Sequence, residues 1–260
     1  GVAVGAVIVV AILMFARVIR ADNLADVVIL VSLAATIAYF VVILSSRKVT
    51  AIERSRVVAF IPLFIVSVGF WSLYQQQFTV MTVYSDKRLN RDLFGWEMPV
   101  PWVQSINPIF IIILSGVFAA LWTKLGTRQP STPVKFGLAA IIMGAAFLLF
   151  LPWAGGGENT TPLLAIIGIL FVFTVAELLL SPIGLSITTK LAPGAFHTQM
   201  VALFFLSVAL GTAIAGWLAQ FYDPRNEVPY FSSLGIAAIV LGVALLLAVK
   251  PVLKLMKGVR

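Results

Sequence analysis

Eight long stretches of this 260-residue chain are nearly free of charge, and each approaches the length of a membrane-spanning helix. A helix needs ~20 apolar residues to cross the ~30 Å of hydrocarbon in a bilayer. Strands of a membrane barrel would instead alternate apolar and polar residues over ~10 positions. The sequence therefore predicts an all-α membrane protein. Its expected spans cover residues 1–16, 27–46, 57–83, 103–123, 136–153, 162–189, 199–222 and 230–249.

Composition and charge agree with this class. Hydrophobic residues make up 61% of the chain and charged residues 11%, and the mean hydropathy is +1.07. The net charge is +8, and the basic residues are scattered over the connections. We therefore expect the chain to contact membrane lipid and not to bind nucleic acid. Alternate connections carry twelve and six Lys and Arg residues. The positive-inside rule then predicts that the C-terminus lies in the cytoplasm. We expect a multi-pass protein of the plasma membrane.

Charge and polarity divide the chain into three expected parts. Residues 1–46 form a lipid-facing helix hairpin, 47–56 a basic cytoplasmic linker and 57–260 a six-helix bundle with more polar content. The chain starts inside an apolar run without an initiator Met or a signal-peptide pattern, so we expect a piece of a longer protein. Connection 84–102 is expected to be an ordered external loop, and connection 154–161 to be flexible.

Glu177 is the one formally charged side chain deep inside an apolar run, and an intramembrane acid indicates a functional site. Ser181 follows one turn later on the same helix face. Pro182 and Gly184 predict a bend with exposed backbone polar groups, as in the discontinuous helices of transporter sites. Such an acid can exchange a proton when its surroundings alternate between wet and dry. The alternative is a permanent ion pair with a Lys or Arg from a helix that is missing from this sequence.

Other spans contribute polar or aromatic candidates. Five polar residues mark the third span: Ser72, Gln75, Gln76, Thr79 and Thr82. Of these, Ser72, Gln76 and Thr79 follow helical spacing and define a stripe centred on Gln76 and Thr79, which either lines a cavity or makes structural hydrogen bonds between helices. Pro108 is expected in the first turn of the fourth span, leaving the Asn107 amide for capping or for a ligand. Phe204 in the seventh span either packs or lines a ligand site.

Metal and enzyme chemistry have little support. The chain has no cysteine and one histidine, His197, in a polar connection, so we expect no metal site and no cofactor other than protons. Neither a nucleophile elbow nor an acidic metal-ligand pair is visible. We therefore predict a carrier, not an enzyme.

Three blocks together resemble the proton-dependent oligopeptide transporter family of the major facilitator superfamily, over residues 57–256. The blocks are Phe70-Trp71 with Gln76, then Leu93-Phe94-Gly95-Trp96-Glu97 through Gln104-Ser105-Ile106-Asn107-Pro108-Ile109-Phe110-Ile111, and Glu177 through Ser181-Pro182-Ile183-Gly184-Leu185-Ser186. This resemblance implies the C-terminal six-helix bundle of a major facilitator fold. The two extra helices of prokaryotic members would precede it, and an N-terminal bundle would complete the carrier.

The resemblance also implies residue roles. Glu177 would engage the amino terminus of a peptide and couple to protons, Asn107 would contact the peptide and Ser181 would supply a pocket hydroxyl. Trp71, Gln75, Gln76 and Phe204 are further substrate-binding candidates. Four positions depart from the family pattern: Gln75 stands where many relatives have an acid, Phe204 for a Trp, Gly116 for a Pro and Thr212 for an Asn.

The expected function is proton-coupled symport of di- and tripeptides by alternating access across a bacterial inner membrane. One alternative keeps the fold and changes the cargo to nitrate, a drug or a glucoside. A further alternative is a membrane subunit without transport activity.

Overall fold

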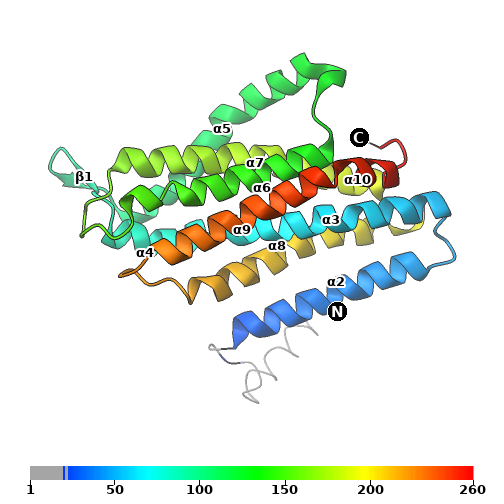
Figure 1. Cartoon of the computed structure of the whole chain (residues 1–260), viewed down its shortest axis with the longest axis horizontal. Coiled ribbons are helices and arrows are strands. Elements are labelled where there is room, and N and C mark those ends of the chain that lie inside the picture. Colours follow the sequence, from blue (N-terminus) through cyan, green and yellow to red (C-terminus); the bar gives the residue numbers. More distant parts are fainter. Residues whose placement is uncertain (1–19, 21–22, 260) are drawn as a thin grey trace, which may run out of the picture.

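The computed structural model describes residue 20 and residues 23–259, and shows long helices packed side by side into a bundle (Figure 1). Its long helices are α2 (Leu24–Ser45), α3 (Ala51–Tyr74), α5 (Val100–Leu125), α6 (Thr132–Leu148), α7 (Leu163–Leu191), α8 (His197–Ala219) and α9 (Val228–Leu247). Shorter elements are α4 (Val80–Lys87), α10 (Val249–Leu255), β1 (Asp92–Leu93) and β2 (Trp96–Glu97).

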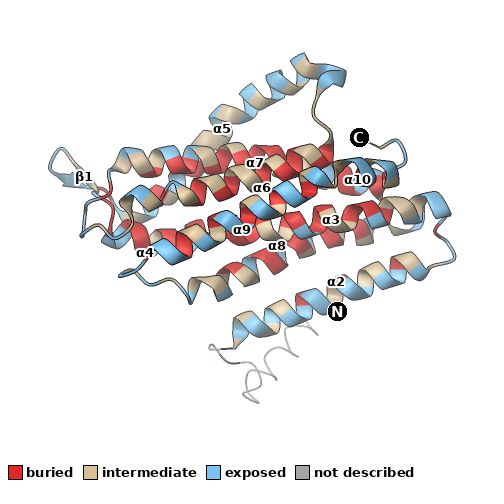
Figure 2. Cartoon of the chain, in the orientation of Figure 1, coloured by how far each residue is buried: buried red, intermediate tan, exposed pale blue. Residues whose placement is uncertain are grey.

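Within the described residues, seven helical segments are long and apolar enough to cross a membrane. Each coincides with one of the expected spans, which confirms the all-α membrane class. The first expected span, residues 1–16, lies outside the described residues, so the proposed hairpin is represented by α2 alone. Figure 2 shows buried residues concentrated at the centre of the bundle, whereas α2 and α5 are largely exposed.

Helix α3 begins earlier than expected, so the linker prediction of 47–56 was too long. Thr50 and Glu53 form a capping box: the Glu53 amide donates to Thr50 Oγ1 over 3.3 Å, and the Thr50 amide donates to Glu53 Oε2 over 2.8 Å. These bonds satisfy first-turn donors that would otherwise lack a partner. The helix therefore starts at Ala51 and includes two of the basic residues assigned to the linker.

The third span is not one continuous helix. Helix α3 ends at Tyr74, a 3-10 turn follows at Gln75–Phe78, and α4 starts after Thr79, whose backbone is not helical (φ −121°, ψ −90°). Broken backbone at membrane depth is stable only where polar groups find partners in the protein or in water. Here the Gln76 side chain provides them, by donating to the carbonyls of Ser72 and Ala215 over 3.3 and 3.1 Å.

Two glycine pairs bring α6 and α9 unusually close together. A Cβ added at Gly144 would lie 2.5 Å from the carbonyl oxygen of Gly235, and one at Gly242 would lie 2.5 Å from that of Gly137. The partners are seven residues apart on both helices, so the pairs lie on one face of each antiparallel helix. In lipid, close approach of backbones through small residues is a main source of helix association.

The connections at the end of the bundle that carries the β1–β2 hairpin are ordered. Strands β1 and β2 pair antiparallel through a turn in which Phe94 and Gly95 have positive φ, at 56° and 87°. This agrees with the expected ordered loop in 84–102. The 154–161 connection was expected to be flexible, but Thr161 exchanges backbone hydrogen bonds with Arg88 and Asn90 at 2.9 and 2.8 Å. That pairing holds the glycine-rich segment against the neighbouring connection.

Candidate functional site

Glu177 lies half-buried on α7 and faces α3 and α5. The Asn107 side chain on α5 donates to Glu177 Oε2 over 3.5 Å. The hydroxyl of Tyr74 on α3 is close enough to interact with the same carboxylate. Three helices that are distant in sequence therefore converge on this acid.

Asn107 is the centre of the group. Its Oδ1 accepts from the Tyr74 hydroxyl over 3.2 Å, and its Nδ2 donates to Thr174 Oγ1 over 3.1 Å as well as to Glu177. Thr174 can accept this bond because its own proton goes to the carbonyl of Leu170 at 2.9 Å. With a side chain that is 1% exposed, Asn107 joins α3, α5 and α7.

The structure corrects the expected position of Asn107 in its helix. Helix α5 starts at Val100, with Pro101 in its first turn, so Pro108 lies inside the helix. Asn107 therefore cannot cap it. The Pro-rich segment 99–101 starts the helix because proline is favoured in a first turn, where its missing N–H loses no bond. The sequence interpretation of Asn107 as a contact residue thus remains and the capping alternative is wrong.

Sequence reasoning missed Tyr74 and Thr174 as members of this group. Both could have been found from helical spacing, since Tyr74 lies three residues after Trp71 and Thr174 three residues before Glu177. Neither stands out in composition, because a single Tyr or Thr is common in an apolar helix. Their roles follow from the crossing of α3 and α7 at Asn107.

Glu177 has no cationic partner among the described residues. Ion pairs such as Arg88–Glu227, Arg91–Asp86 and Arg91–Glu97 lie elsewhere in the bundle. Its visible contacts are the neutral Asn107 amide and the Tyr74 hydroxyl. A carboxylate placed among neutral donors can pair with an incoming cation or take up a proton. These are the two chemical events open to the site.

Two polar residues of the third span, Gln75 and Gln76, hydrogen-bond to α8. The Gln76 side chain is 1% exposed, its amide nitrogen bonds to backbone carbonyls, and its oxygen accepts from Thr79 Oγ1 over 3.0 Å. Gln76 therefore fits the structural alternative of interhelical hydrogen bonding. Gln75 is half-buried, and its side chain donates to Thr212 Oγ1 over 2.8 Å.

Comparison with known proteins identifies the fold and family. The family model PTR2, described as the POT family, matches residues 14–237. The chain belongs to the POT family. An uncharacterized transporter of Bacillus subtilis, YclF, is 42% identical over 237 residues, which cover 90% of this chain and 48% of that protein. A di-/tripeptide transporter of Lactococcus lactis subsp. cremoris is 39% identical over 245 residues, covering 92% of this chain and 49% of that protein.

Solved structures of POT proteins have the same arrangement of helices. The peptide transporter POT in complex with sulfate superposes with a TM-score of 0.89 and 43% identity, over 99% of this chain and 53% of that one. A POT family transporter in complex with 5-aminolevulinic acid gives a TM-score of 0.86 and 34% identity, over 96% and 53%. The chain thus spans about half the length of the relatives that it matches.

In this POT-family chain, α7 does not break at Pro182. It is helical from Leu163 to Leu191, and the bend expected at Pro182 and Gly184 stays a prediction. The broken backbone lies at Gln75–Thr79 instead. An α-helix can tolerate one proline because the missing donor and the ring clash are local, and tertiary packing of the flanking turns offsets them.

Gly184 has a packing role. A Cβ at this position would lie 2.5 Å from Cε2 of Phe204, so the glycine makes room for that ring between α7 and α8. Phe204 is 6% exposed and packs edge-on against Phe205 at 5.6 Å between ring centroids. The structure therefore supports the packing alternative for Phe204. Ser181 is half-buried on α7, one turn beyond Glu177.

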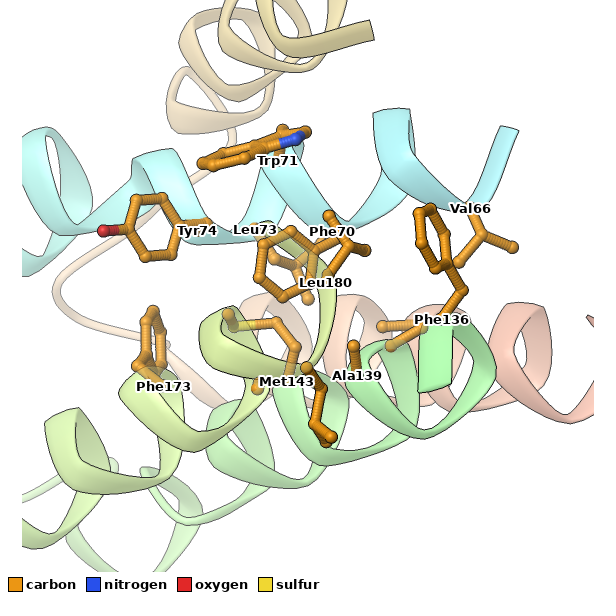
Figure 3. Packing of buried hydrophobic residues seen from close by; sticks show 14 of the residues in the cluster. Val66, Phe70, Trp71, Leu73, Tyr74, Phe136, Ala139, Met143, Phe173 and Leu180 are labelled. Atoms are coloured by element: carbon orange, nitrogen blue, oxygen red, sulfur yellow. The ribbon is translucent and has the colours of Figure 1, made fainter. Parts of the chain in front are cut away.

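Trp71 belongs to an aromatic group on α3. Figure 3 shows it beside Phe70 and Tyr74, and its ring centroid is 5.2 Å from that of Tyr74. Its indole Nε1 is buried and donates to none of the described residues. The close contact of the Trp71 Cβ with Gly211 brings α3 against α8. Trp71 thus helps to position Tyr74 for its bond to Asn107.

Two of the residues that depart from the family pattern, Gln75 and Thr212, contact each other. The Gln75–Thr212 hydrogen bond joins the residue that replaces an acid to the residue that replaces an Asn. A neutral bond between α3 and α8 therefore stands at the place where the resemblance implies charge. Gly116, the third departure, lies on α5 where an added Cβ would meet nothing within 4 Å.

A buried ion pair at the end of the bundle that carries the β1–β2 hairpin was not foreseen from the sequence. Arg88 Nε lies 3.1 Å from Glu227 Oε1, and the Glu227 side chain is fully buried. The Tyr222 hydroxyl donates to the same oxygen over 2.7 Å. Burial, together with the negative charge of Glu227, raises the pKa of Tyr222, so its hydroxyl stays protonated and keeps donating at alkaline pH. The sequence analysis placed both residues in connections between the expected spans, without a pairing between them.

Proposed function

We propose that this chain is the C-terminal part of a proton-coupled symporter for di- and tripeptides. The observation that carries the proposal is the Glu177 carboxylate, held among neutral groups from α3 and α5 and without an ion pair in the described part of the chain. Its counter-charge can then be the ammonium group of a peptide or a proton. Membership of the POT family, and relatives named di-/tripeptide transporters, support this assignment.

The neighbours of Glu177 have complementary roles in this proposal. Asn107 keeps one oxygen of the carboxylate oriented and offers its amide to a peptide that enters the site. Tyr74 fixes the Asn107 amide by occupying its oxygen. Ser181, one turn away on α7, supplies a further hydroxyl. Protonation of Glu177 removes the charge that holds the peptide amine, which links substrate release to proton binding.

Alternating access requires a second bundle. Helix α5 presents a row of exposed apolar side chains, Ile109, Ile112, Ile113 and Val117, on the side away from the core. Contact of this face with an N-terminal bundle of the same protein and with lipid would cover it. Rocking of the two bundles around a site near the midplane would expose Glu177 first to one side and then to the other.

Transport is tested by proton-driven uptake of labelled di-alanine in cells that produce the intact protein. Glu177→Gln keeps the size and polarity of the side chain but removes the titratable charge, so gradient-driven uptake should be lost. Glu158→Gln, in an exposed connection, is the matched control and should transport normally. Undiminished proton-driven uptake by Glu177→Gln would count against the proposal.

Cargo is tested by competition. Unlabelled di- and tripeptides should inhibit the uptake of labelled di-alanine, whereas nitrate and a glucoside should not. If the protein takes up nitrate or a glucoside, and peptides do not inhibit that uptake, this POT-family chain has a different substrate.

The proposed location is the plasma membrane with a cytoplasmic C-terminus, which the excess of basic residues on that side supports. Because the sequence has no cysteine, single cysteines can be introduced and labelled with a membrane-impermeant maleimide. Glu158→Cys should be labelled in intact cells, and Lys257→Cys only after permeabilisation. The reverse labelling pattern would invert the orientation.

A further inference from the structure

A cavity of about 660 Å³ lies at the end of the bundle where α10 packs, away from Glu177 and its partners. It is bounded by the end of α5, the start of α6 and the last turns of α7, and Figure 1 shows the α5–α6 connection descending towards α10 there. Its volume falls in the range of small-molecule sites, which is ~300–1,000 Å³. Neither the transport site nor the resemblance accounts for it.

The charged groups of the cavity have one sign. Lys135 on α6 and Lys190 in the last turn of α7 both line it, while its lining includes neither Asp nor Glu among the described residues. The two ammonium groups are near enough to repel each other. Like charges that share a partly enclosed space are destabilising unless an anion joins them.

Lys135 is held in position by neutral groups. Its Nζ donates to Gln129 Oε1 over 2.9 Å and lies 4.0 Å from the centre of the Trp122 ring. The Gln129 amide in turn donates to the carbonyl of Trp122 over 2.8 Å. The Lys135 residue is 7% exposed, so a cation has been placed at the cavity wall without a paired carboxylate in the described residues. Two of its three N–H donors remain for a ligand.

Uncharged donors surround the lysines. Helix α6 begins at Thr132, and its N-cap residue Ser131 makes no side-chain capping bond. Both residues line the cavity together with Ser186, so three hydroxyl-bearing residues lie at its wall. Ammonium and hydroxyl groups together donate the hydrogen bonds that a tetrahedral oxyanion accepts.

We propose that this cavity binds a phosphate-bearing anion, which is either the headgroup of an anionic lipid or free inorganic phosphate. Trp122 and Ile183 give one wall an apolar character that suits an acyl chain next to a headgroup. The bound anion neutralises Lys135 and Lys190 and joins the end of α5 to α6 and α7. This site does not depend on which substrate the protein transports.

Binding is measured on the intact protein, purified in a neutral detergent, from the rise of the thermal unfolding midpoint as a ligand is titrated. The probes are phosphatidylglycerol, phosphatidylcholine and inorganic phosphate, the last compared with chloride at equal ionic strength. A rise with phosphatidylglycerol but not with the other probes assigns the site to a lipid headgroup. A rise with inorganic phosphate alone assigns it to the free anion, and no rise with either overturns the proposal.

Variants show whether the binding occurs in this cavity. Lys190→Gln and Lys135→Gln should each weaken the apparent affinity for the anion about fivefold, and together more than either alone. Lys124→Gln is the matched control, since Lys124 is an exposed lysine at the same end of α5 that does not line the cavity. Unchanged affinity in Lys190→Gln and Lys135→Gln, or an equal loss in Lys124→Gln, would refute the site. Lys190 is exposed, so its variant is expected to fold even if Lys135→Gln does not.

Discussion

The hydroxyl of Tyr74 on α3 donates a hydrogen bond to the side-chain oxygen of Asn107 on α5, at 3.2 Å, and thereby sets which way the Asn107 amide points. With its oxygen occupied, Asn107 turns its NH₂ group to Thr174 and Glu177 on α7. The reversed amide would place a donor against the Tyr74 proton and an oxygen against the carboxylate. Tyr74 is thus a positioning residue for the carboxylate contact.

Removing this hydroxyl should reduce transport more than stability. In Tyr74→Phe the Asn107 oxygen loses its donor, at a cost of about 1–3 kcal/mol, and the amide is free to reverse. We expect peptide uptake to show a raised KM and a changed pH profile, because the contact of Asn107 with Glu177 weakens. Uptake kinetics measured from pH 5 to 8 check this.

Tyr39→Phe provides the comparison, since it removes a tyrosine hydroxyl on the peripheral helix α2. Its kinetics should match the unsubstituted protein. A Tyr74→Phe variant with the KM and pH profile of Tyr39→Phe would show that the hydroxyl does not position Asn107.

The Arg88–Glu227 pair should be important for stability. Glu227→Ala leaves a buried guanidinium without its carboxylate and should destabilise the protein by about 3–5 kcal/mol. The thermal unfolding midpoint in detergent measures the loss. Arg225→Ala, which removes an exposed charge two residues away, should change it little.

A double variant shows whether the stability effect comes from the ion pair or from each residue separately. Because Arg88→Met combined with Glu227→Leu removes both buried charges, it should be more stable than Glu227→Ala alone. If the double variant is as unstable as the sum of the two single changes, the residues act independently and the pair is not the source of the effect.

The close approach of α6 and α9 is tested by paired glycine substitutions. Gly144→Ala places a methyl group 2.5 Å from the Gly235 carbonyl, so the helices must separate, at a cost of about 1–3 kcal/mol. Gly116→Ala is the same chemical change on α5 where nothing lies within 4 Å, and should be neutral or stabilising by up to about 1 kcal/mol. Equal unfolding midpoints for the two variants would contradict this packing.

Substitutions can distinguish two roles of Gly184, which are making room for the Phe204 ring and allowing α7 to bend. Gly184→Ala should disturb the Phe204 ring and lower both the unfolding midpoint and uptake, whereas Gly168→Ala on the same helix meets no atom within 4 Å and should not. Because the clash is with one ring, adding Phe204→Leu to Gly184→Ala should restore part of the midpoint. If it restores nothing, Gly184 acts through the helix backbone, as a bend would require.

Much of the fold follows from the sequence because the bilayer demands helices of one length. Each described span overlaps an expected apolar run, and Glu177 stood out because no other charge lies at its depth. Errors occurred where a proline or a polar side chain set the limits of a helix. Pro101 starts α5 ahead of the expected boundary, and Gln76 supports a break inside what hydropathy presented as one span.

The site could be predicted in part only. Glu177 and Asn107 were identified and the structure brings them together, although Asn107 lies 70 residues earlier in the chain. Tyr74 and Thr174 were not, because a single Tyr or Thr does not stand out in an apolar helix even where its helical spacing from Trp71 or Glu177 is suitable. Gln76 and Phe204 were candidates by position, but the side chains around them engage Gln76 in bonds to α8 and pack Phe204 against Gly184.

The sequence by itself determined that the chain lies in a lipid bilayer, where its membrane spans lie apart from the undescribed first one, and that one acid is isolated among apolar residues. These properties depend on residue type along a local stretch. The tertiary structure decided which groups meet. The bonds of Asn107 to Tyr74 and Glu177, the close approach of Gly144 to Gly235 and the ion pair of Arg88 with Glu227 all join segments that are distant in the sequence. Such contacts depend on the rotation and crossing of each helix, which local periodicity in an apolar chain does not specify.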